Sequence, residues 1–299
     1  MSKPSPKVSV VVPAYNEEDI IGDIIKRITD TLTKTEYSFE VIVIDDGSTD
    51  ETGIHAEEAG ANVIRHPYNI GLGAAIKTGI RNTQGEIILM LDADGQHSPE
   101  DIPRLLEKID PYDLVVGART KESDSAVHRD FANTVYNLLA SYVSGQRIED
   151  LTSGFKAIKA TTARGFIYLL PNRFSSSSTL TLATLRSGRS VAYVPIVSPK
   201  RVGKSKIRLL RDGFRFLLII LRIATFYSPL KIFIPISALM FLTGFGYGLF
   251  KVLVLDLPYG STSAMLMTIS VVVFMVGLVS EQVALLRFER SERFERGDE

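Results

Sequence analysis

Short apolar runs alternate with amphipathic segments through the first 120 or so residues of the chain. Residues 8–13, 40–44, 62–64, 86–91 and 113–117 are rich in Val, Ile and Leu and predict buried strands. Between the first two, Ile21, Ile24, Ile25, Ile28 and Leu32 recur at helical spacing and predict a crossover helix. Further helices are expected at about 73–82 and 99–109. This alternation favours an α/β fold with a mostly parallel, doubly wound sheet that binds ligands at the carboxyl ends of its strands.

The pattern changes after about residue 206. Residues 207–228 mix Arg with Leu, Ile and Phe, which predicts a helix lying in a membrane interface. Residues 232–255 and 262–286 are each close to the roughly 20 apolar residues that cross a bilayer, and the short polar link between them predicts a hairpin. Basic residues flank both outer ends, so both ends of the hairpin are expected in the cytoplasm. Two buried core helices of a soluble protein are the competing interpretation.

The predicted organisation therefore has four parts. A cytosolic catalytic domain covers 1–206, interface helices cover 207–229, two transmembrane helices cover 230–287, and a charged cytosolic tail covers 288–299. Two charges fall inside the spans. We expect Lys251 to extend toward the far interface, and Glu281 either to lie near the cytoplasmic end or to contact a partner helix.

Composition narrows the class of protein. The 34 basic and 34 acidic residues balance, which argues against nucleic acid as a partner of the whole molecule. The absence of cysteine excludes disulfides and thiolate zinc sites. The N-terminus has no long apolar run of the kind found in signal peptides, so the first domain is expected in the cytosol.

Three polar clusters follow predicted strands. In PAYNEE (13–18), Tyr15 is placed to lie beside a flat base and Glu17 to accept hydrogen bonds from it; the alternative is a turn in which Asn16 caps the next helix. In DDGSTD (45–50), Asp45 and Asp46 are candidates to bind ribose hydroxyls or a base, and Ser48 or Thr49 is expected to start a helix.

The third cluster, LMLDADGQHSPED (89–101), places Asp92 and Asp94 either side of Ala93 at a strand end. Two such carboxylates repel each other unless a hard cation bridges them, and Mg²⁺ or Mn²⁺ held in this way completes its shell with phosphate oxygens. Gln96 and His97 are secondary candidate ligands. The cluster predicts a metal and diphosphate site.

Glycine and basic residues complete the candidates. Gly71 and Gly73 open a helix, where they permit either a phosphate or sugar to approach the backbone or tight helix packing. Arg119 and Arg129 are candidates to hold an anionic acceptor or leaving group. The basic segment 199–208 suits a loop that closes over phosphates, or a juxtamembrane charge that fixes topology.

These motifs and DLTSGFK at 150–156 resemble, in their order and spacing, the family 2 glycosyltransferases of the dolichyl-phosphate mannose synthase type. This type includes bacterial polyprenyl-phosphate glycosyltransferases. The resemblance covers about residues 8–210. The resemblance implies a GT-A (Rossmann-like) fold and an inverting single displacement. It assigns nucleotide-sugar contacts to Pro13, Tyr15, Glu17, Asp46, Asp92, Ala93, Arg201 and Lys206. It assigns the metal to Asp94 and Gln96, with Asp92 as a further candidate. It assigns catalytic roles to Asp94, Arg119, Arg129 and Asp150, of which the two arginines would hold the acceptor phosphate and Asp150 would orient the acceptor.

The implied enzyme is a multi-pass protein of the cell membrane with both termini in the cytoplasm. With Mg²⁺ or Mn²⁺ it moves a hexosyl group from GDP-mannose, UDP-glucose or a UDP-N-acetylhexosamine to dolichyl or polyprenyl phosphate. A lipid phosphate is already ionised and needs no carboxylate base. The alternatives are a transferase with a hydroxyl acceptor and a catalytically silent membrane module. Gly244, Gly246 and Gly248 offer small surfaces for a homo-oligomer.

Overall fold

A computed structural model describes residues 6–120, 127–173, 175–198 and 228–296 of the chain. The chain divides into two compact units, of which one contains a β-sheet and the other two long helices. The predicted interface helices at 207–229 fall almost entirely outside the described residues.

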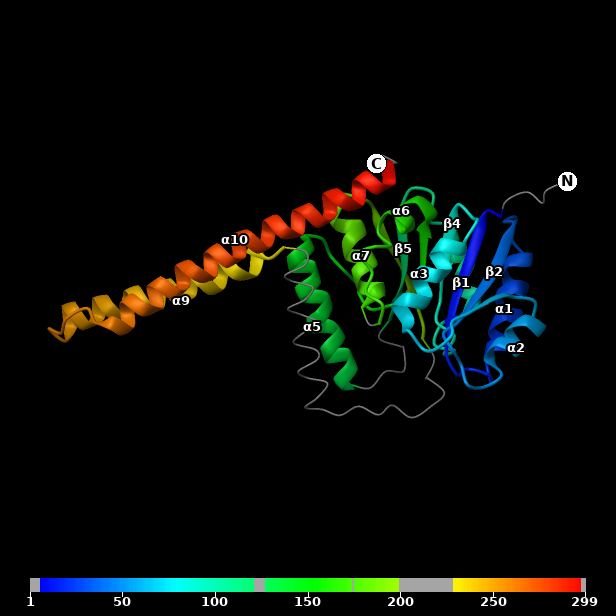
Figure 1. Cartoon of the computed structure of the whole chain (residues 1–299), viewed down its shortest axis with the longest axis horizontal. Helices are drawn as coiled ribbons and strands as arrows, with labels where there is room; N and C mark the ends of the chain where they lie inside the picture. Colours follow the sequence, from blue (N-terminus) through cyan, green and yellow to red (C-terminus); the bar gives the residue numbers. More distant parts are fainter. Residues whose placement is uncertain (1–5, 121–126, 174, 199–227, 297–299) are drawn as a thin grey trace. The chain divides into compact units, whose positions relative to one another are not determined.

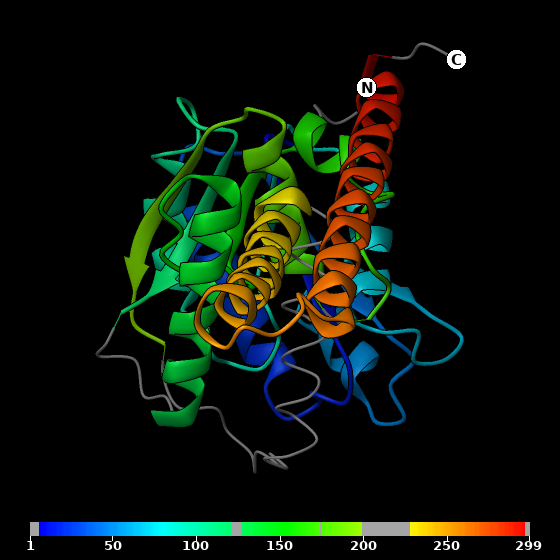
Figure 2. The same cartoon turned by 90° about the vertical axis from the view of Figure 1, so that its left-hand side faces the viewer.

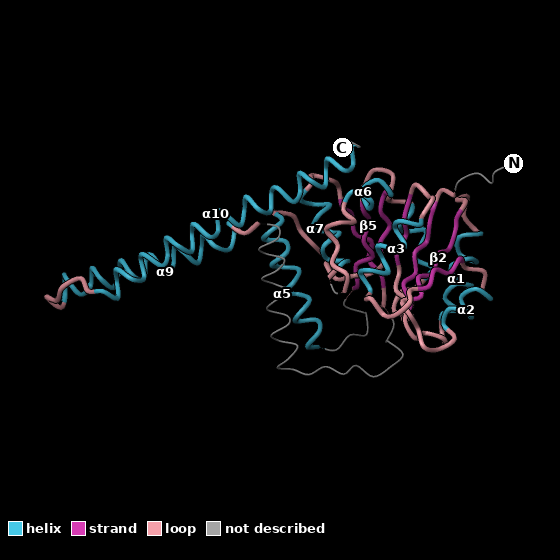
Figure 3. The backbone as a smooth tube through the Cα atoms, viewed as in Figure 1, coloured by secondary structure: helices cyan, strands magenta, loops and turns pink. Residues whose placement is uncertain are grey.

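Seven strands form a single mixed sheet in the first unit (Figures 1 and 3), and the spatial order is β3-β2-β1-β4-β6-β5-β7. Their bounds are β1 Val8–Ala14, β2 Phe39–Asp45, β3 Asn62–Arg65, β4 Ile87–Met90, β5 Leu114–Arg119, β6 Lys156–Lys159 and β7 Val191–Ile196. All neighbours pair in parallel except β6, which runs antiparallel to both β4 and β5. One edge of the sheet therefore gathers the carboxyl ends of six strands and the start of β6.

Helices cover both faces of this sheet, as the sequence predicts. The helices of this unit are α1 Ile21–Thr33, α2 Thr52–Glu58, α3 Leu72–Asn82, the 3₁₀ turn η1 Pro99–Asp101, α4 Ile102–Leu106, α5 Val127–Ser144, α6 Ala160–Gly165 and α7 Ser176–Arg186. The five apolar positions predicted for α1 are all buried, in a cluster with Val10 and Val12. Val11 points the other way and meets Gly79 of α3.

The expectation that Ser48 or Thr49 starts a helix is wrong, because α2 begins at Thr52. The capping interpretation of Asn16 is also wrong. Helix α1 begins at Ile21 without a side-chain cap, and Asn16 instead accepts a hydrogen bond from the backbone N–H of Thr49 at 2.9 Å. Asn16 has a φ of 55°, a left-handed conformation that Asn tolerates better than most residues. The first two polar clusters are therefore joined to each other at the sheet edge.

The second unit holds α9 (Leu230–Val254) and α10 (Ser261–Arg296), which run side by side as a hairpin (Figures 1 and 2). Residues 230–254 and 261–286 are both long and apolar enough to cross a membrane. Helix α10 continues to Arg296, so most of the segment expected as a charged tail is helical.

Small residues line the contact within the hairpin. A Cβ added to Gly244 would lie 2.9 Å from Leu266, and one added to Gly248 would lie 2.3 Å from the ring of Tyr259. A Cβ on Gly246 would meet nothing within 4 Å. Glu281 of α10 accepts a hydrogen bond from the backbone N–H of Leu230 at 3.3 Å, where α9 has N–H groups without helical partners. The glycines at 244 and 248 thus serve packing inside one chain.

Candidate active site

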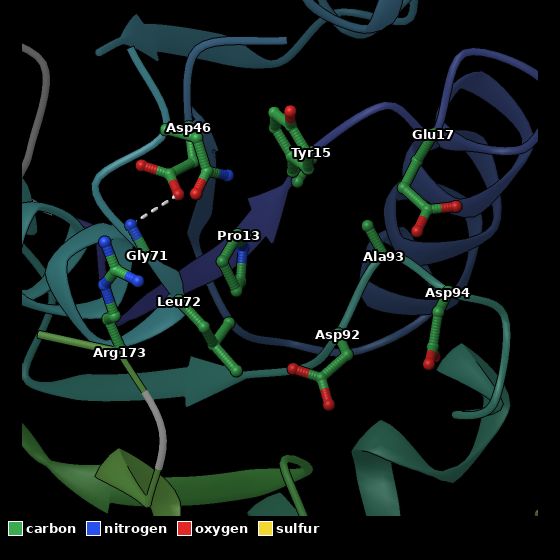
Figure 4. Close-up of a pocket in the computed structure, with 12 residues that line it drawn as sticks. Pro13, Tyr15, Glu17, Asp46, Gly71, Leu72, Asp92, Ala93, Asp94 and Arg173 are labelled. Carbon is green, nitrogen blue, oxygen red and sulfur yellow. Dashed lines mark hydrogen bonds between the residues drawn. The ribbon is translucent and has the colours of Figure 1, made fainter. Parts of the chain in front are cut away.

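A pocket of about 480 Å³ opens at the sheet edge where β1, β2 and β4 end (Figure 4). The sequence predicts eight of its lining residues: Pro13, Tyr15, Glu17, Asp46, Gly71, Asp92, Ala93 and Asp94. Asp46, Gly71 and Arg173 lie on one side, Glu17 and Asp94 lie on the other, and Pro13 and Tyr15 lie between them. The pocket thus joins an aromatic surface to several carboxylates.

Asp46 is fixed by three hydrogen bonds. Its Oδ1 accepts from His66 Nδ1 at 2.7 Å and from the N–H of Ile70 at 3.1 Å, and its Oδ2 accepts from the N–H of Gly71 at 2.8 Å. His66 is itself buried, and its Nε2 lies 2.9 Å from the hydroxyl of Thr78. A carboxylate has about four lone-pair positions, so Asp46 retains about one for a ligand, on Oδ2.

Asp45 is not a ligand-binding residue, contrary to the expectation from sequence. Its side chain is fully buried and does not line the pocket. Its Oδ1 accepts from the N–H of Ser48 at 2.8 Å, and its Oδ2 lies 3.2 Å from Arg65 Nε. Asp45 therefore holds the turn that presents Asp46.

The glycines at the start of α3 leave room for another part of the chain, the segment 171–173. A Cβ on Gly73 would lie 1.9 Å from the carbonyl oxygen of Pro171, so only glycine fits. The N–H of Gly73 donates to the carbonyl of Arg173, and that of Ala74 to the carbonyl of Asn172. The tight-packing interpretation is therefore confirmed for Gly73, whereas Gly71 lines the pocket, where the approach of a ligand to its backbone stays a prediction. The packing at Gly73 brings the side chain of Arg173 into the pocket.

Asp92 and Asp94 both line the pocket and are partly exposed. Asp94 Oδ1 accepts from the N–H of Gln96 at 3.1 Å, and Asp92 Oδ2 lies 3.5 Å from Nε2 of the buried His97. No group of three or more acidic, His or Cys residues that could hold a metal occurs in the described part of the chain. The two carboxylates that line the pocket are a donor set that fits Mg²⁺ or Mn²⁺, which are held by one or two carboxylates and completed by ligand oxygens.

Lys156 lies behind Asp92 and is fully buried. Its Nζ donates to the carbonyl of Ser177 at 2.5 Å and to the hydroxyl of Thr181 at 2.6 Å. Burial lowers the pKa of Lys156 to about 7, although Asp150 and Asp92 act in the opposite direction. Burial also opposes ionisation of Asp92, but His97, Lys156 and Arg119 together leave the pKa of Asp92 below its ordinary value.

Arg119 and Asp150 form a forked ion pair at the same edge. Arg119 Nε and Nη2 lie 2.7 and 2.9 Å from the two carboxylate oxygens, and Nη2 also donates to Thr152 at 2.6 Å. Burial raises the pKa of Asp150, but the hydrogen bonds and charge of Arg119 outweigh it and leave this pKa below its ordinary value. Asp150 is therefore a poor proton acceptor near neutral pH.

The other predicted site residues divide into two groups. Gln96 does not line the pocket, although its carbonyl accepts from the hydroxyl of Ser198 at 2.7 Å. Arg129 belongs to α5, but its side chain is outside the described part of the structure, and Arg201 and Lys206 lie outside the described residues altogether. Their assignments remain predictions.

Among the residues at or behind the pocket that were not assigned from sequence are His66, Lys156 and Arg173. Lys156 is the first residue of β6 and follows Phe155, and this local pattern does not by itself show that its side chain is buried. Arg173 lies about 100 residues from the glycines that admit it, and no local pattern marks it.

The model of the family "Glycosyl transferase family 2" matches residues 9–166, which is more than half of the chain. A second model, "GtrB C-terminal hairpin", matches residues 228–286, which include α9 and the apolar part of α10. The second match supports the interpretation of these two helices as one conserved structural element.

Relatives agree with these matches. An undecaprenyl-phosphate 4-deoxy-4-formamido-L-arabinose transferase of Klebsiella pneumoniae is 32% identical over 266 residues, which cover 86% of this chain and 79% of the relative. An uncharacterized protein of Methanocaldococcus jannaschii is 32% identical over 200 residues, covering 64% of this chain and 80% of that protein.

Among solved structures, glucosyl-3-phosphoglycerate synthase of Mycobacterium tuberculosis, crystallised with Mn²⁺, UDP and glucosyl-3-phosphoglycerate, matches with a TM-score of 0.57. The match covers 73% of this chain and 78% of the other at 22% identity. It confirms the predicted GT-A type of fold.

Proposed function

The chain belongs to glycosyl transferase family 2, and from this premise we propose that it transfers a hexosyl group from a nucleotide-sugar to the phosphate of a polyprenyl or dolichyl lipid. The pocket at the sheet edge is the observation that carries the proposal. It combines an exposed aromatic ring at Tyr15, the remaining lone pair of Asp46 and the carboxylates of Asp92 and Asp94. The relative from Klebsiella acts, by its name, on an undecaprenyl phosphate.

Within this pocket, Tyr15 and Pro13 would contact the base, and Asp94, with Asp92 beside it, would hold Mg²⁺ or Mn²⁺. A bound divalent cation would offset the charge that builds up on the departing nucleoside diphosphate. His97 orients Asp92 from behind, since the facing atoms of the two side chains lie 3.5 Å apart. The chain's own residues thus fix the donor before the acceptor attacks.

We infer further that the donor base is uracil. Asp46 keeps about one lone pair, because His66, Ile70 and Gly71 use the others. Uracil offers a single N–H between two carbonyl groups and needs one such acceptor, whereas guanine offers adjacent N–H and NH₂ donors and needs two. The exposed guanidinium of Arg173 has no hydrogen-bond or ion-pair partner among the described residues, so it is available to donate to a carbonyl of uracil.

The acceptor is proposed to be a phosphate because the site lacks a suitable base at Asp150. Asp150 is held by Arg119, and its pKa lies below the ordinary value, so it would not deprotonate a sugar hydroxyl. An ionised lipid phosphate attacks the anomeric carbon without such help. Arg119 and Asp150 would then position the acceptor, with Arg129 as a further cation, whereas Arg201 and Lys206 would hold the donor diphosphate.

The hairpin supports a lipid acceptor. A lipid phosphate stays at the membrane surface, and two helices of membrane-spanning length would keep the enzyme there. We propose that the protein is a multi-pass membrane protein with its catalytic unit and both termini in the cytoplasm. A homo-oligomer through the hairpin would have to use surfaces other than Gly244 and Gly248, which pack within the chain.

The test uses full-length protein in detergent with Mn²⁺ or Mg²⁺, a short polyprenyl phosphate and labelled UDP-glucose, UDP-N-acetylglucosamine or GDP-mannose. We expect a labelled lipid with a UDP-sugar, and loss of at least about 100-fold of this activity in Asp94→Asn. Glu100→Gln is the matched control, since Glu100 lies in η1, six residues after Asp94 and outside the pocket, and pairs with Arg27. No labelled lipid with any donor would refute the proposed acceptor.

A further inference from the structure

A second, smaller cavity of about 60 Å³ lies next to the donor pocket. Asp92 and Leu72 line both, so the two spaces share a wall. The segment that leads into β6 lies close against this wall, since a Cβ on Gly154 would lie 2.2 Å from Asp92 Oδ2. A sugar attached to a diphosphate at Asp92 and Asp94 would therefore lie at the entrance to the smaller cavity.

One end of this cavity is polar. Lys156 lines it, and its buried Nζ has two hydrogen-bond partners, Ser177 and Thr181, among the described residues. The amino group keeps one further position, which is a third N–H in the charged form and a lone pair in the neutral form. A hydrogen bond from a ligand or water stabilises a buried polar group that has an unused hydrogen-bonding position. A ligand group that accepts or donates a hydrogen bond would therefore bind favourably beside Lys156.

The lining also has an apolar part beside the polar residues. Leu72, Ile76 and Leu180 belong to this apolar wall, and both Ile76 and Leu180 are almost completely buried. A sugar hydroxyl would reach Lys156 but leave this apolar wall uncovered. An acylamino group presents a carbonyl, an N–H and a short apolar end within the space of a few heavy atoms, and so complements both walls.

We propose that this cavity receives an acylamino substituent of the donor sugar, held by Lys156 and packed against Leu72, Ile76 and Leu180, so that the enzyme prefers N-acylated amino sugars. The inference rests on the proposed function, because it takes the donor diphosphate to lie at Asp92 and Asp94. Lys156 acts here as a specificity-determining residue.

The test measures binding to full-length protein in detergent with Mn²⁺, and needs no lipid acceptor. The ligands are UDP, UDP-glucose, its 2-acetamido and 4-acetamido analogues, and UDP-glucuronic acid. We expect one acetamido analogue to bind at least about 10-fold more tightly than UDP-glucose, which is the size of effect of a hydrogen bond to a buried amino group plus a buried methyl. Lys156→Met and Leu180→Phe should each reduce this ratio to about 2 or less. UDP affinity should stay unchanged in Leu180→Phe. Lys156→Met removes a charge near Asp92, and any change in affinity from this cause should be the same for all five ligands and so should not alter the ratio.

UDP affinity is the control for folding, since a misfolded variant would lose it as well. Lys159→Met, on the same strand but outside this cavity, should keep the wild-type ratio. The proposal is overturned if UDP-glucose or UDP-glucuronic acid binds as tightly as both acetamido analogues, or if Lys156→Met keeps the wild-type ratio. Either result would overturn the proposed sugar preference and would not bear on the proposed transfer reaction. Failure to form a lipid product in the transfer assay would refute the proposed function.

Discussion

Replacement of Lys156 by Met should change how the stability of the catalytic unit depends on pH. The Lys156 amino group is fully buried, and burial lowers its pKa to about 7 from an ordinary value of 10.5. Below pH 7 both the folded and the unfolded chain carry this proton, so stability does not vary with pH on its account. Between pH 7 and 10.5 the unfolded chain binds more protons, and the folded state gains stability as pH rises.

The magnitude follows from the pKa difference. At 1.36 kcal/mol per pKa unit, burial of the charged Lys156 lowers the free energy of unfolding by about 5 kcal/mol below pH 7. This loss of stability disappears as the pH reaches 10.5. By pH 9.5 the free energy of unfolding should have risen by about 3 kcal/mol from this residue alone. Lys156→Met lacks the titrating group and should lack this rise.

The assay is urea denaturation of the metal-free protein in detergent at pH 6.5 to 9.5, followed by far-UV circular dichroism because the chain has no Trp. The quantity of interest is the wild-type free energy of unfolding minus that of the variant, in which shared titrations cancel. Lys159→Met serves as the control, since Lys159 lies on the same strand with its side chain 39% exposed. A difference that stays flat from pH 7 to 9.5 would refute a depressed Lys156 pKa.

Three further substitutions test other parts of the structure. Arg119→Lys removes the two-pronged hydrogen bonding to the buried Asp150. It should lower the unfolding free energy, measured by urea titration, by about 1–3 kcal/mol, and should raise the acceptor concentration that the transfer assay needs. Unchanged stability would contradict the role of the ion pair. Gly73→Ala places a Cβ against a carbonyl oxygen, so the melting temperature should fall by several degrees, with weaker UDP binding by calorimetry. Gly248→Val should loosen the helical hairpin, as read by cross-linking of cysteines introduced across it, whereas Gly246→Val should not.

The donor side of the site was predictable because it is built from strand ends. Strands β1, β2 and β4 are each visible as an apolar run, and parallel strands bring residues such as Tyr15, Asp46 and Asp94 to one edge whatever lies between them in sequence. Strands β6 and β7, which extend the other half of the sheet, were not predicted. The comparison of Asp45 with Asp46 marks the limit of this reasoning. The two are neighbours of identical type, and only the side to which each points makes one structural and the other a pocket residue.

Residues that act through packing could not be predicted from sequence. Arg173 reaches the pocket because Gly73 leaves room for Pro171, and this contact is specified by shape across the fold. Lys156 reads as an ordinary charged residue until burial and its two hydrogen bonds are known. Burial depends on tertiary structure, so the pKa and the cavity that follow from it appear only in the folded chain.

The placement of β6 also has a consequence for biosynthesis. Strand β5 precedes β6 in the chain but joins β4 only through it. Until Lys159 has left the ribosome, the apolar strand β4 has an unpaired edge, and at roughly 5–20 residues per second this exposure lasts several seconds. The nascent protein therefore has an unpaired, aggregation-prone strand edge well before the helical hairpin of α9 and α10 is synthesised. Its yield in cells should depend on chaperones that cover such edges during translation.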